Sequence, residues 1–125
     1  MVPKNNIPAL AANAHALVFN LIDVPVFRFG ISSNKLFDYM ASARPILFCS
    51  NASNNPIADA GCGIAVPPQE PDSLAKAMLM LAKKPRDERV RMGAAGRRHV
   101  EENYSYNRLA QRLAETLDAC CKDKV

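Results

Sequence analysis

The sequence predicts an α/β fold: a three-layer, Rossmann-like partial domain with a short parallel sheet of about three strands, helices on both faces, and helices at the end of the chain. Short, continuously apolar runs alternate with amphipathic segments, and continuous apolarity is expected for strands covered on both sides. Strands that alternate with helices form parallel sheets through right-handed crossovers. We therefore expect residues 1–125 to form a single domain.

The amino-terminal part of the chain carries one predicted helix, one strand and a loop. Asn6 can cap a helix that has Pro8 in its first turn and that runs to about Asn13. The apolar run from His15 to Leu21 is the first predicted strand. Val24 to Gly30, which contains a proline, is predicted to be a loop.

A second helix and a second strand follow this loop. Ser33 is the expected N-cap of the helix, and Pro45 ends it and leads into the strand Ile46–Cys49. Asn34 and Asp38 share one side of the helix at a spacing of four residues. The other side is predicted to be an apolar stripe made of Leu36, Phe37, Met40 and Ala43.

The third strand is bounded by turn residues. Asn55-Pro56 starts a short helix that Gly61 stops, and Gly63 to Val66 is the strand. Pro67-Pro68 then breaks the chain before the final helices.

Three helices complete the predicted domain. The first has an acidic first turn at Glu70-Pro71-Asp72 and closes at Pro85. The second runs from about Asp87 to Asn103, where two glycines indicate close backbone packing. The last begins at Ser105. The predicted inner faces of the three helices are, in order, Leu74, Met78, Leu81 and Ala82; Met92, Gly96 and Val100; and Leu109, Leu113, Leu117 and Cys120.

The composition is that of a globular protein with a modest positive charge. Hydrophobic residues make up 49% and charged residues 22% of the chain, which is ordinary for a globular domain. The net charge of +4 favours anionic partners, but most of the basic excess falls between Lys83 and Arg112, on helix faces expected to be solvated. Aromatic residues amount to 6%, too few to interleave with this charge as nucleic-acid modules require. We therefore expect no nucleic-acid partner.

The cysteines and the apolar segments limit other classes of function. Cys49 and Cys62 are expected to be small buried hydrophobes, and Cys120-Cys121 could oxidise between chains. No CxxC spacing or nearby histidine pair suggests zinc, so we expect no metal site. The longest apolar stretch, Ala16 to Ile22, is too short to span a bilayer, and no signal-peptide pattern is found. These features predict a cytoplasmic protein.

The segment from Phe29 to Pro45 is the most informative for function. It combines a small polar turn, an amphipathic helix and a proline that leads into an apolar strand. The turn offers the hydroxyls of Ser32 and Ser33 and free backbone N–H groups at a helix N-terminus, where anions bind readily. Asp38 lies one turn inside the helix. The same residues can also be interpreted as a simple strand-turn-helix connection with a capped helix.

A run of twelve residues, Gly30 to Ala41, fits the motif Gly-x-Ser-x-Asn-Lys-Leu-Phe-(Asp/Glu)-Tyr-Met-Ala. It resembles the nucleotide-sugar-binding segment of family-four glycosyltransferases, which are retaining enzymes built from two Rossmann-like halves. Weaker similarity extends over nearly the whole chain, at residues 7–10, 59–67, 92–97 and 104–105. The resemblance implies the C-terminal, donor-binding segment of such an enzyme.

The resemblance also implies roles for individual residues. The amides near Ser33 would bind the diphosphate, and Asp38 would accept hydrogen bonds from the ribose diol. The resembling enzymes carry a motif of two acids separated by seven residues, and Asp38 matches the second acid. The first acid, which usually contacts the donor sugar, would fall at Gly30, so the identity of the sugar stays open. Lys35 either counters phosphate charge or pairs with Asp38 on the surface. The expected donor-binding residues are Gly30, Ile31, Ser32, Ser33, Asn34, Lys35 and Asp38.

No catalytic residue and no cofactor are expected in this segment; the donor, a nucleotide diphosphate sugar, is a substrate. In the resembling enzymes the acceptor domain and a basic pair that clamps the diphosphate lie upstream of the matched segment. Because sugar transfer depends on neutralising the departing diphosphate, we expect the segment alone to be inactive and at most a weak nucleotide binder. The resemblance suggests a role in polysaccharide or glycan synthesis, by analogy alone.

The expected partners follow from this interpretation. They are the nucleotide diphosphate sugar and the missing amino-terminal half or a separate subunit. The stripe from Leu109 to Leu117 and an exposed sheet edge also predict a homo-oligomer. The alternative function is a non-catalytic interaction module that pairs with a partner glycosyltransferase subunit.

Overall fold

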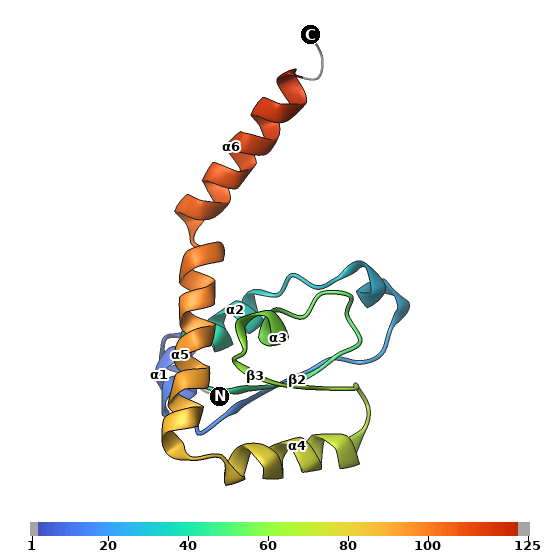
Figure 1. The fold of residues 1–125 in the computed structure, drawn as a ribbon, viewed down its shortest axis with the longest axis vertical. Helices are drawn as coiled ribbons and strands as arrows, with labels where there is room; N and C mark the ends of the chain where they lie inside the picture. Colours follow the sequence, from blue (N-terminus) through green and yellow to red (C-terminus); the bar gives the residue numbers. More distant parts are fainter. Residues whose placement is uncertain (1–2, 123–125) are drawn as a thin grey trace.

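The computed structural model describes residues 3–122 and contains a parallel sheet with strand order β1-β2-β3 (Figure 1). The strands are β1 (Leu17–Asn20), β2 (Ile46–Cys49) and β3 (Gly63–Val66). Val18 of β1 lies beside Leu47 of β2, which in turn lies beside Ile64 of β3. The predicted α/β class and all three predicted strands are confirmed, although β1 is shorter than the run from His15 to Leu21.

Helices connect the strands and extend the chain beyond them. A 3-10 turn, η2 (Pro25–Phe29), lies inside the segment that was predicted to be a loop, and another, η1 (Lys4–Asn6), precedes the first α-helix. The α-helices are α1 (Ile7–Asn13), α2 (Asn34–Ala41), α3 (Pro56–Ala60), α4 (Pro71–Lys83), α5 (Arg86–Asn103) and α6 (Tyr106–Lys122). No helix within residues 3–122 is both long enough and apolar enough to cross a bilayer.

Helices cover both faces of the sheet, as predicted. On one face, Phe19, Ile46 and Phe48 of the strands pack in a single cluster with residues of α2 and α3. On the other face, Leu47 packs against α4. All four residues of β2 are buried, because this central strand has neighbours on both edges and helices on both faces. The helix residues in these clusters are Leu36, Met40, Ile57, Ala77 and Leu81.

Strand β1 does not follow the expectation that both sides of every strand are covered. Val18 is 41% exposed, although it lies beside the fully buried Leu47. The reason is that α4 packs on β2 and β3 and does not reach over the outer strand. An apolar side chain therefore remains at the edge of the sheet.

The inner face of α4 differs from the predicted one by one position. Ala77 and Leu81 are buried, whereas Met78 is 50% exposed and Ala82 is also exposed. Ala77 and Met78 are neighbours on the helix, and the sheet packs against the alanine because a small side chain lets the helix approach closely. The predicted contribution of Met78 and Ala82 to this face was wrong.

The capping residues behave differently from one helix to the next. Asn55 caps α3 by accepting a hydrogen bond from the Ala58 N–H at 3.0 Å, and Gly61 ends that helix with a φ of +63°. Asn6 and Ser33 occupy the predicted N-cap positions, but their side chains make no capping hydrogen bond. Ala43 is not part of the α2 stripe, because it lies beyond the end of α2 with a φ of +56°.

Helix α5 packs against the body through its two glycines. A Cβ atom at Gly93 would lie 2.0 Å from the backbone oxygen of Ala43, and one at Gly96 would lie 2.9 Å from the Cβ of Cys62. Only glycine permits such close approach, which confirms the predicted backbone packing.

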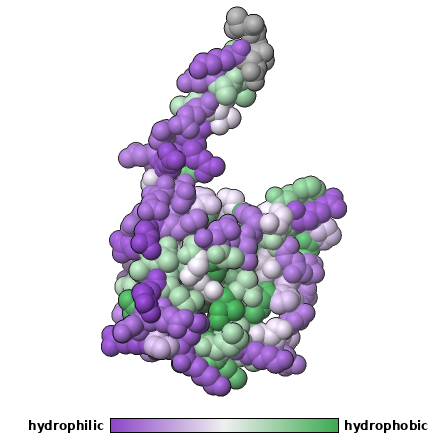
Figure 2. All heavy atoms as spheres, viewed as in Figure 1, coloured by the Kyte–Doolittle hydropathy of each residue, from purple (hydrophilic) through white to green (hydrophobic). Residues whose placement is uncertain are grey.

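Helix α6 projects from the body as an arm (Figure 1). All of its described residues are exposed, including the predicted stripe, in which Leu113 is 60% exposed and Leu117 is 56% exposed. In the space-filling view the arm is mainly hydrophilic, with apolar residues interspersed along it (Figure 2). No part of the described chain covers these leucines.

Candidate functional site

The polar turn and the start of α2 lie at the carboxyl end of β1. Ser33 and Lys35 border a hollow of about 370 Å³ together with the last residues of this strand. We call it the carboxyl-edge hollow; its lining residues are Val18, Phe19, Asn20, Leu21, Ser33, Lys35 and Tyr39. Ligands of parallel sheets bind at this edge, so the turn lies where a small-molecule site is expected in such a sheet.

Asn54 holds the turn in place. The Ile31 N–H donates a hydrogen bond to Oδ1 of Asn54 at 2.7 Å, and Nδ2 of Asn54 donates to the Ile31 carbonyl at 2.8 Å. The Ser53 N–H also donates to the carbonyl of Phe27 at 3.3 Å. The loop after β2 thus pairs with the loop before α2. The oxygen and the nitrogen of one amide side chain both bond the backbone that leads into the helix, and so fix its position.

Gly30 is required by this backbone. Its φ is +99°, and a Cβ atom would lie 3.0 Å from Oδ1 of Asn54. A side chain at this position would be strained and would press on the amide that holds Ile31. The geometry therefore explains why glycine stands where the resembling motif has its first acid.

The start of α2 presents unused hydrogen-bond donors. Ser33 has an extended backbone at the N-cap position, and its hydroxyl is not engaged in capping. In the described part of the chain, no hydrogen bond is made by the backbone N–H groups of Ser32, Ser33, Asn34 and Lys35. These donors, together with the positive end of the helix dipole, favour an anion at this point.

Asp38 is accessible, but it borders a different hollow. It is exposed and lines a space of about 580 Å³ between α1, α2 and α5, which we call the α1–α2 hollow. The lining residues are Lys4, Ile7, Pro8, Ala11, Ala12, Asp38, Tyr39, Ala41, Ser42 and Arg97. Tyr39 lines both hollows. The structure thus brings Ser33 and Lys35 together in one hollow and places Asp38 in the neighbouring hollow.

The two hollows are nevertheless close neighbours along α2. Asp38 lies four residues beyond Asn34 on the same side of the helix, which is about 6 Å along the axis. Lys35 and Asp38 do not form an ion pair: the ion pairs found in residues 3–122 are Lys84–Glu88 and Arg97–Glu101. The surface pairing considered for Lys35 is therefore not what the structure shows.

Several residues at the carboxyl edge escaped the sequence-based prediction. Besides Asn54, they include Gln69, whose Oε1 accepts a hydrogen bond from the Asp23 N–H at 3.1 Å, and Asn51, whose Nδ2 donates to the Asp23 carboxylate at 3.4 Å. The available signal was the polar run that follows β2, because residues after a buried parallel strand gather at this edge.

The buried thiols and the histidines offer no reactive group to this site. Burial raises the pKa of the Cys62 thiol to about 11 and also raises the pKa of Cys49, so both remain protonated near neutral pH. Their burial confirms the predicted structural role. His99 packs at a tilt against Tyr104, with 5.9 Å between the ring centroids. Within residues 3–122, no three His, Cys, Asp or Glu side chains are grouped closely enough to hold a metal ion.

Comparison with known proteins assigns the chain to a protein family. A family model described as "Glycosyl transferase-like" matches residues 2–115, which include both hollows and the whole of α2. Searches of curated proteins and of solved structures found no similar protein.

Proposed function

The chain belongs to the glycosyl transferase-like family, and we propose that it forms the donor-binding, carboxyl-terminal part of a family-four glycosyltransferase with two Rossmann-like halves. The full enzyme would transfer a sugar from a nucleotide diphosphate sugar to an acceptor in polysaccharide or glycan synthesis. A cytoplasmic location is part of the same proposal and has its basis in the sequence alone.

The observation that carries the proposal is the group of free donors at the start of α2. The backbone N–H groups from Ser32 to Lys35 make no hydrogen bond in the described chain, although they lie on a turn that Asn54 holds rigidly. Donors that are fixed before the ligand arrives lose little energy on reorganisation, which is the property that a phosphate site needs. The Ser33 hydroxyl is likewise not engaged in capping and can donate to a bound phosphate.

We place the nucleotide along one side of α2. The diphosphate would accept hydrogen bonds from the amides around Ser33, with Lys35 beside it as a counter-charge. The ribose would extend about one helical turn further, where the exposed carboxylate of Asp38 can accept two hydrogen bonds from the diol. In this pose Tyr39, which lines both hollows, would lie beside the bound nucleotide.

The same geometry limits what the segment can do alone. The helix dipole and one lysine supply only part of the positive charge that a departing diphosphate demands. Gly30 provides no carboxylate for the donor sugar. The proposal therefore assigns donor binding to this segment, and assigns the acceptor and the remaining charge to an amino-terminal half or a separate subunit.

Calorimetric titration with UDP and with GDP tests the proposal. We expect weak binding of one of them, and we expect Asp38→Ala to weaken it at least about tenfold, because a charge-assisted hydrogen-bond pair is lost. Asp59→Ala is the matched control: it removes the same charge from an exposed position on α3 and should leave affinity unchanged. Absence of binding at millimolar nucleotide to folded protein would refute the proposal.

The loop can be tested separately from the ribose contact. Asn54→Ala removes both hydrogen bonds to Ile31 and should weaken nucleotide binding by about as much as Asp38→Ala. Asn51→Ala, in the same loop but bonded to Asp23, should have a smaller effect. Equal effects of the two substitutions would show that the clamp on Ile31 does not matter.

A second candidate function, a non-catalytic interaction module, is favoured by one specific observation. The leucine stripe of α6 is uncovered in the described chain. Arg108 and Arg112 lie in the first half of this helix, and Glu115 and Asp118 lie in the second half. An antiparallel second copy would place these opposite charges against each other over the leucines, so the occupant that the charges favour is another molecule of this chain.

Nucleotide titration and light scattering distinguish the two candidates. Nucleotide binding that depends on Asp38 supports the donor-binding segment. Folded protein that binds no nucleotide at millimolar concentration supports the interaction module, and a stable dimer in that case identifies a second copy of this chain as its partner. A monomer that neither binds nucleotide nor self-associates would point to a separate partner subunit for α6.

A further inference from the structure

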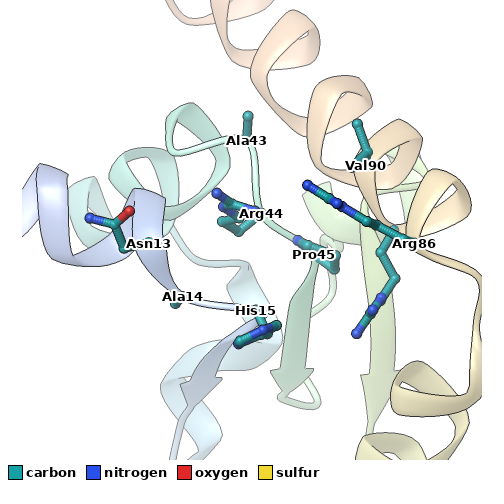
Figure 3. Close-up of a pocket in the computed structure, with 9 residues that line it drawn as sticks. Asn13, Ala14, His15, Ala43, Arg44, Pro45, Arg86 and Val90 are labelled. Carbon is teal, nitrogen blue, oxygen red and sulfur yellow. The ribbon is translucent and has the colours of Figure 1, made fainter.

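A third hollow, with a strongly basic lining, lies at the amino ends of β1 and β2. It has a volume of about 410 Å³ and is bordered by the end of α1, the turn before β2 and the first turn of α5. We call it the basic hollow. Figure 3 shows His15, Arg44 and Arg86 reaching this space from three separate segments. The lining residues are Asn13, Ala14, His15, Ala43, Arg44, Pro45, Arg86, Arg89 and Val90.

No acidic residue lines the basic hollow, although three arginines and a histidine do. The ion pairs found in residues 3–122 engage none of these three arginines. The acids of the first turn of α5, Asp87 and Glu88, do not line the space, and Glu88 is paired with Lys84. The positive charge is therefore concentrated here without compensation from the lining.

Arg44 has a partner that fixes its direction. Its Nε donates a hydrogen bond to the Ala12 carbonyl at 2.6 Å, at the carboxyl end of α1, where a cation is favoured by the helix dipole. This bond accounts for one of its five N–H groups. The remaining ones leave the guanidinium able to take a further acceptor.

The positions of Arg86 and Arg89 are not explained by a favourable helix dipole, as the position of Arg44 is. They lie in the first turn of α5, at the positive end of an 18-residue helix, where cations are disfavoured and anions are attracted. Two cations on one side of this helix end, in the lining of the same hollow as Arg44, raise the electrostatic energy of the empty protein. An anion in the hollow would remove that cost, and would accept hydrogen bonds from guanidinium groups and free helix amides together.

The fold holds these groups together by close backbone contacts. Gly93 of α5 lies directly against the Ala43 carbonyl, which brings the start of α5 to the turn that carries Arg44. Ala43 itself has a φ of +56°, a conformation that costs energy for any residue other than glycine. The arginines thus converge on rigid elements, which is the condition for a pre-organised binding site.

We propose that the basic hollow binds a compound with two or more phosphate charges. Guanidinium groups pair with phosphate oxygens through two parallel hydrogen bonds, and three of them match a diphosphate better than a single carboxylate. The volume is within the usual range for small-molecule sites and exceeds the needs of one phosphate. The diphosphate could belong to a soluble compound or to a lipid headgroup, and the site is separate from the donor site at the start of α2.

Titration with inorganic pyrophosphate tests the proposal on the whole chain. Backbone NMR shifts are expected at His15, Arg44 and the first turn of α5. The double variant Arg86→Gln/Arg89→Gln should weaken binding at least about tenfold, because it removes two charge-assisted contacts. The matched control is Arg91→Gln/Arg98→Gln, which makes the same change at exposed positions of the same helix that do not line the hollow. Thermal unfolding of both variants verifies that they fold.

A second arm distinguishes the two sources of phosphate. Vesicles of phosphatidylcholine with cardiolipin, a lipid whose headgroup carries two phosphates, are compared with vesicles of phosphatidylcholine alone in a sedimentation assay. Pyrophosphate binding that only the Arg86/Arg89 variant weakens supports a soluble ligand, and vesicle binding that only this variant weakens supports a lipid headgroup. Equal losses in the two variants, or no binding to either probe, would overturn the proposal.

The outcome is also independent of the donor site. Asp38→Ala should leave pyrophosphate binding at the basic hollow unchanged. Shifts confined to residues 30–38 would overturn the basic hollow while leaving the donor site intact.

Discussion

Two consecutive helices, α5 and α6, show opposite relations between sequence pattern and packing. They have similar lengths, 18 and 17 residues. Helix α6 has a regular leucine stripe at every fourth residue, yet Leu109, Leu113 and Leu117 are all exposed. Helix α5 is rich in charged residues and nevertheless packs closely against α2. An apolar stripe shows that a helix can be covered, but it does not say by what.

Helix α5 packs closely against the body because two of its residues are glycines without side chains. Gly93 and Gly96 let its backbone touch the Ala43 carbonyl and Cys62, and such close contact gains dispersion energy without needing leucines. Helix α6 packs against no surface in the described chain, so its leucine stripe contributes no packing energy in the monomer. Three substitutions and one pH titration sharpen this comparison, from the largest expected effect to the smallest.

Gly93→Val should be the most damaging change. The new Cβ would lie 2.0 Å from the Ala43 oxygen, and backbone cannot move aside cheaply. We expect a loss of at least about 3 kcal/mol in the free energy of unfolding, measured by urea denaturation. Ala94→Val, at the adjacent exposed position, should cost only about 0.5 kcal/mol. Similar losses would mean that α5 does not dock through its glycines.

Alkaline pH should loosen the same contact through Cys62. Its pKa is raised by burial to about 11 from an ordinary value of 9.0, so the unfolded chain releases this proton first. Stability is therefore complete below pH 9 and falls as pH rises through about 11, by roughly 2–3 kcal/mol. Urea titrations across this range should show the slope, and Cys62→Ala should reduce it. The exposed Cys120 can be replaced by alanine without changing the slope.

Tyr104, between the two helices, should have an intermediate effect. Its ring stacks on Phe37 of α2 at a centroid distance of 4.4 Å and is the last aromatic contact before the arm. Tyr104→Ala should cost about 1–2 kcal/mol in thermal or urea unfolding. Tyr106→Ala, two residues later and 91% exposed, should cost less than about 0.5 kcal/mol. A larger loss at Tyr106 would mean that α6 contacts the body in solution.

Leu113→Ala should have the smallest effect on the monomer. Because Leu113 is 60% exposed, its loss should change unfolding by less than about 0.5 kcal/mol in dilute protein. The effect should instead appear in association. Size-exclusion chromatography with light scattering should give a dimer for the natural sequence and a monomer for Leu113→Glu. A monomeric natural sequence would contradict self-association through α6.

Much of the fold follows from signals that act within a few residues. Asn55 and Gly61 bound α3, and the third strand begins and ends where the pattern predicts it. The errors concern packing. Met78 is exposed and Ala77 is buried, whereas Met78 was predicted to lie on the inner face, and Val18 remains partly exposed. Neither outcome can be predicted from the helix or strand itself, because each depends on where α4 lies on the sheet.

The site shows the same division. The polar turn, the glycine and the start of α2 were predictable, because cap and turn residues have strong local preferences. The clamp on Ile31 was not, since Asn54 lies 23 residues away in sequence. Ser33 and Asp38 border different hollows, and this depends on how α1 and α5 border α2. The convergence of Arg44, Arg86 and Arg89 needs the glycine contact of α5.

Local chemistry was therefore enough to set the order of helices and strands, the buried central strand and the polar turn at the start of α2. Capping, backbone dihedral preferences and hydrophobic period act between near neighbours, so the chain carries them in any context. The tertiary structure alone decided which side chains share a hollow, which apolar faces stay open and where three arginines meet. Those outcomes depend on contacts between distant segments, and the energy of such contacts exists only once the backbone has brought the segments together.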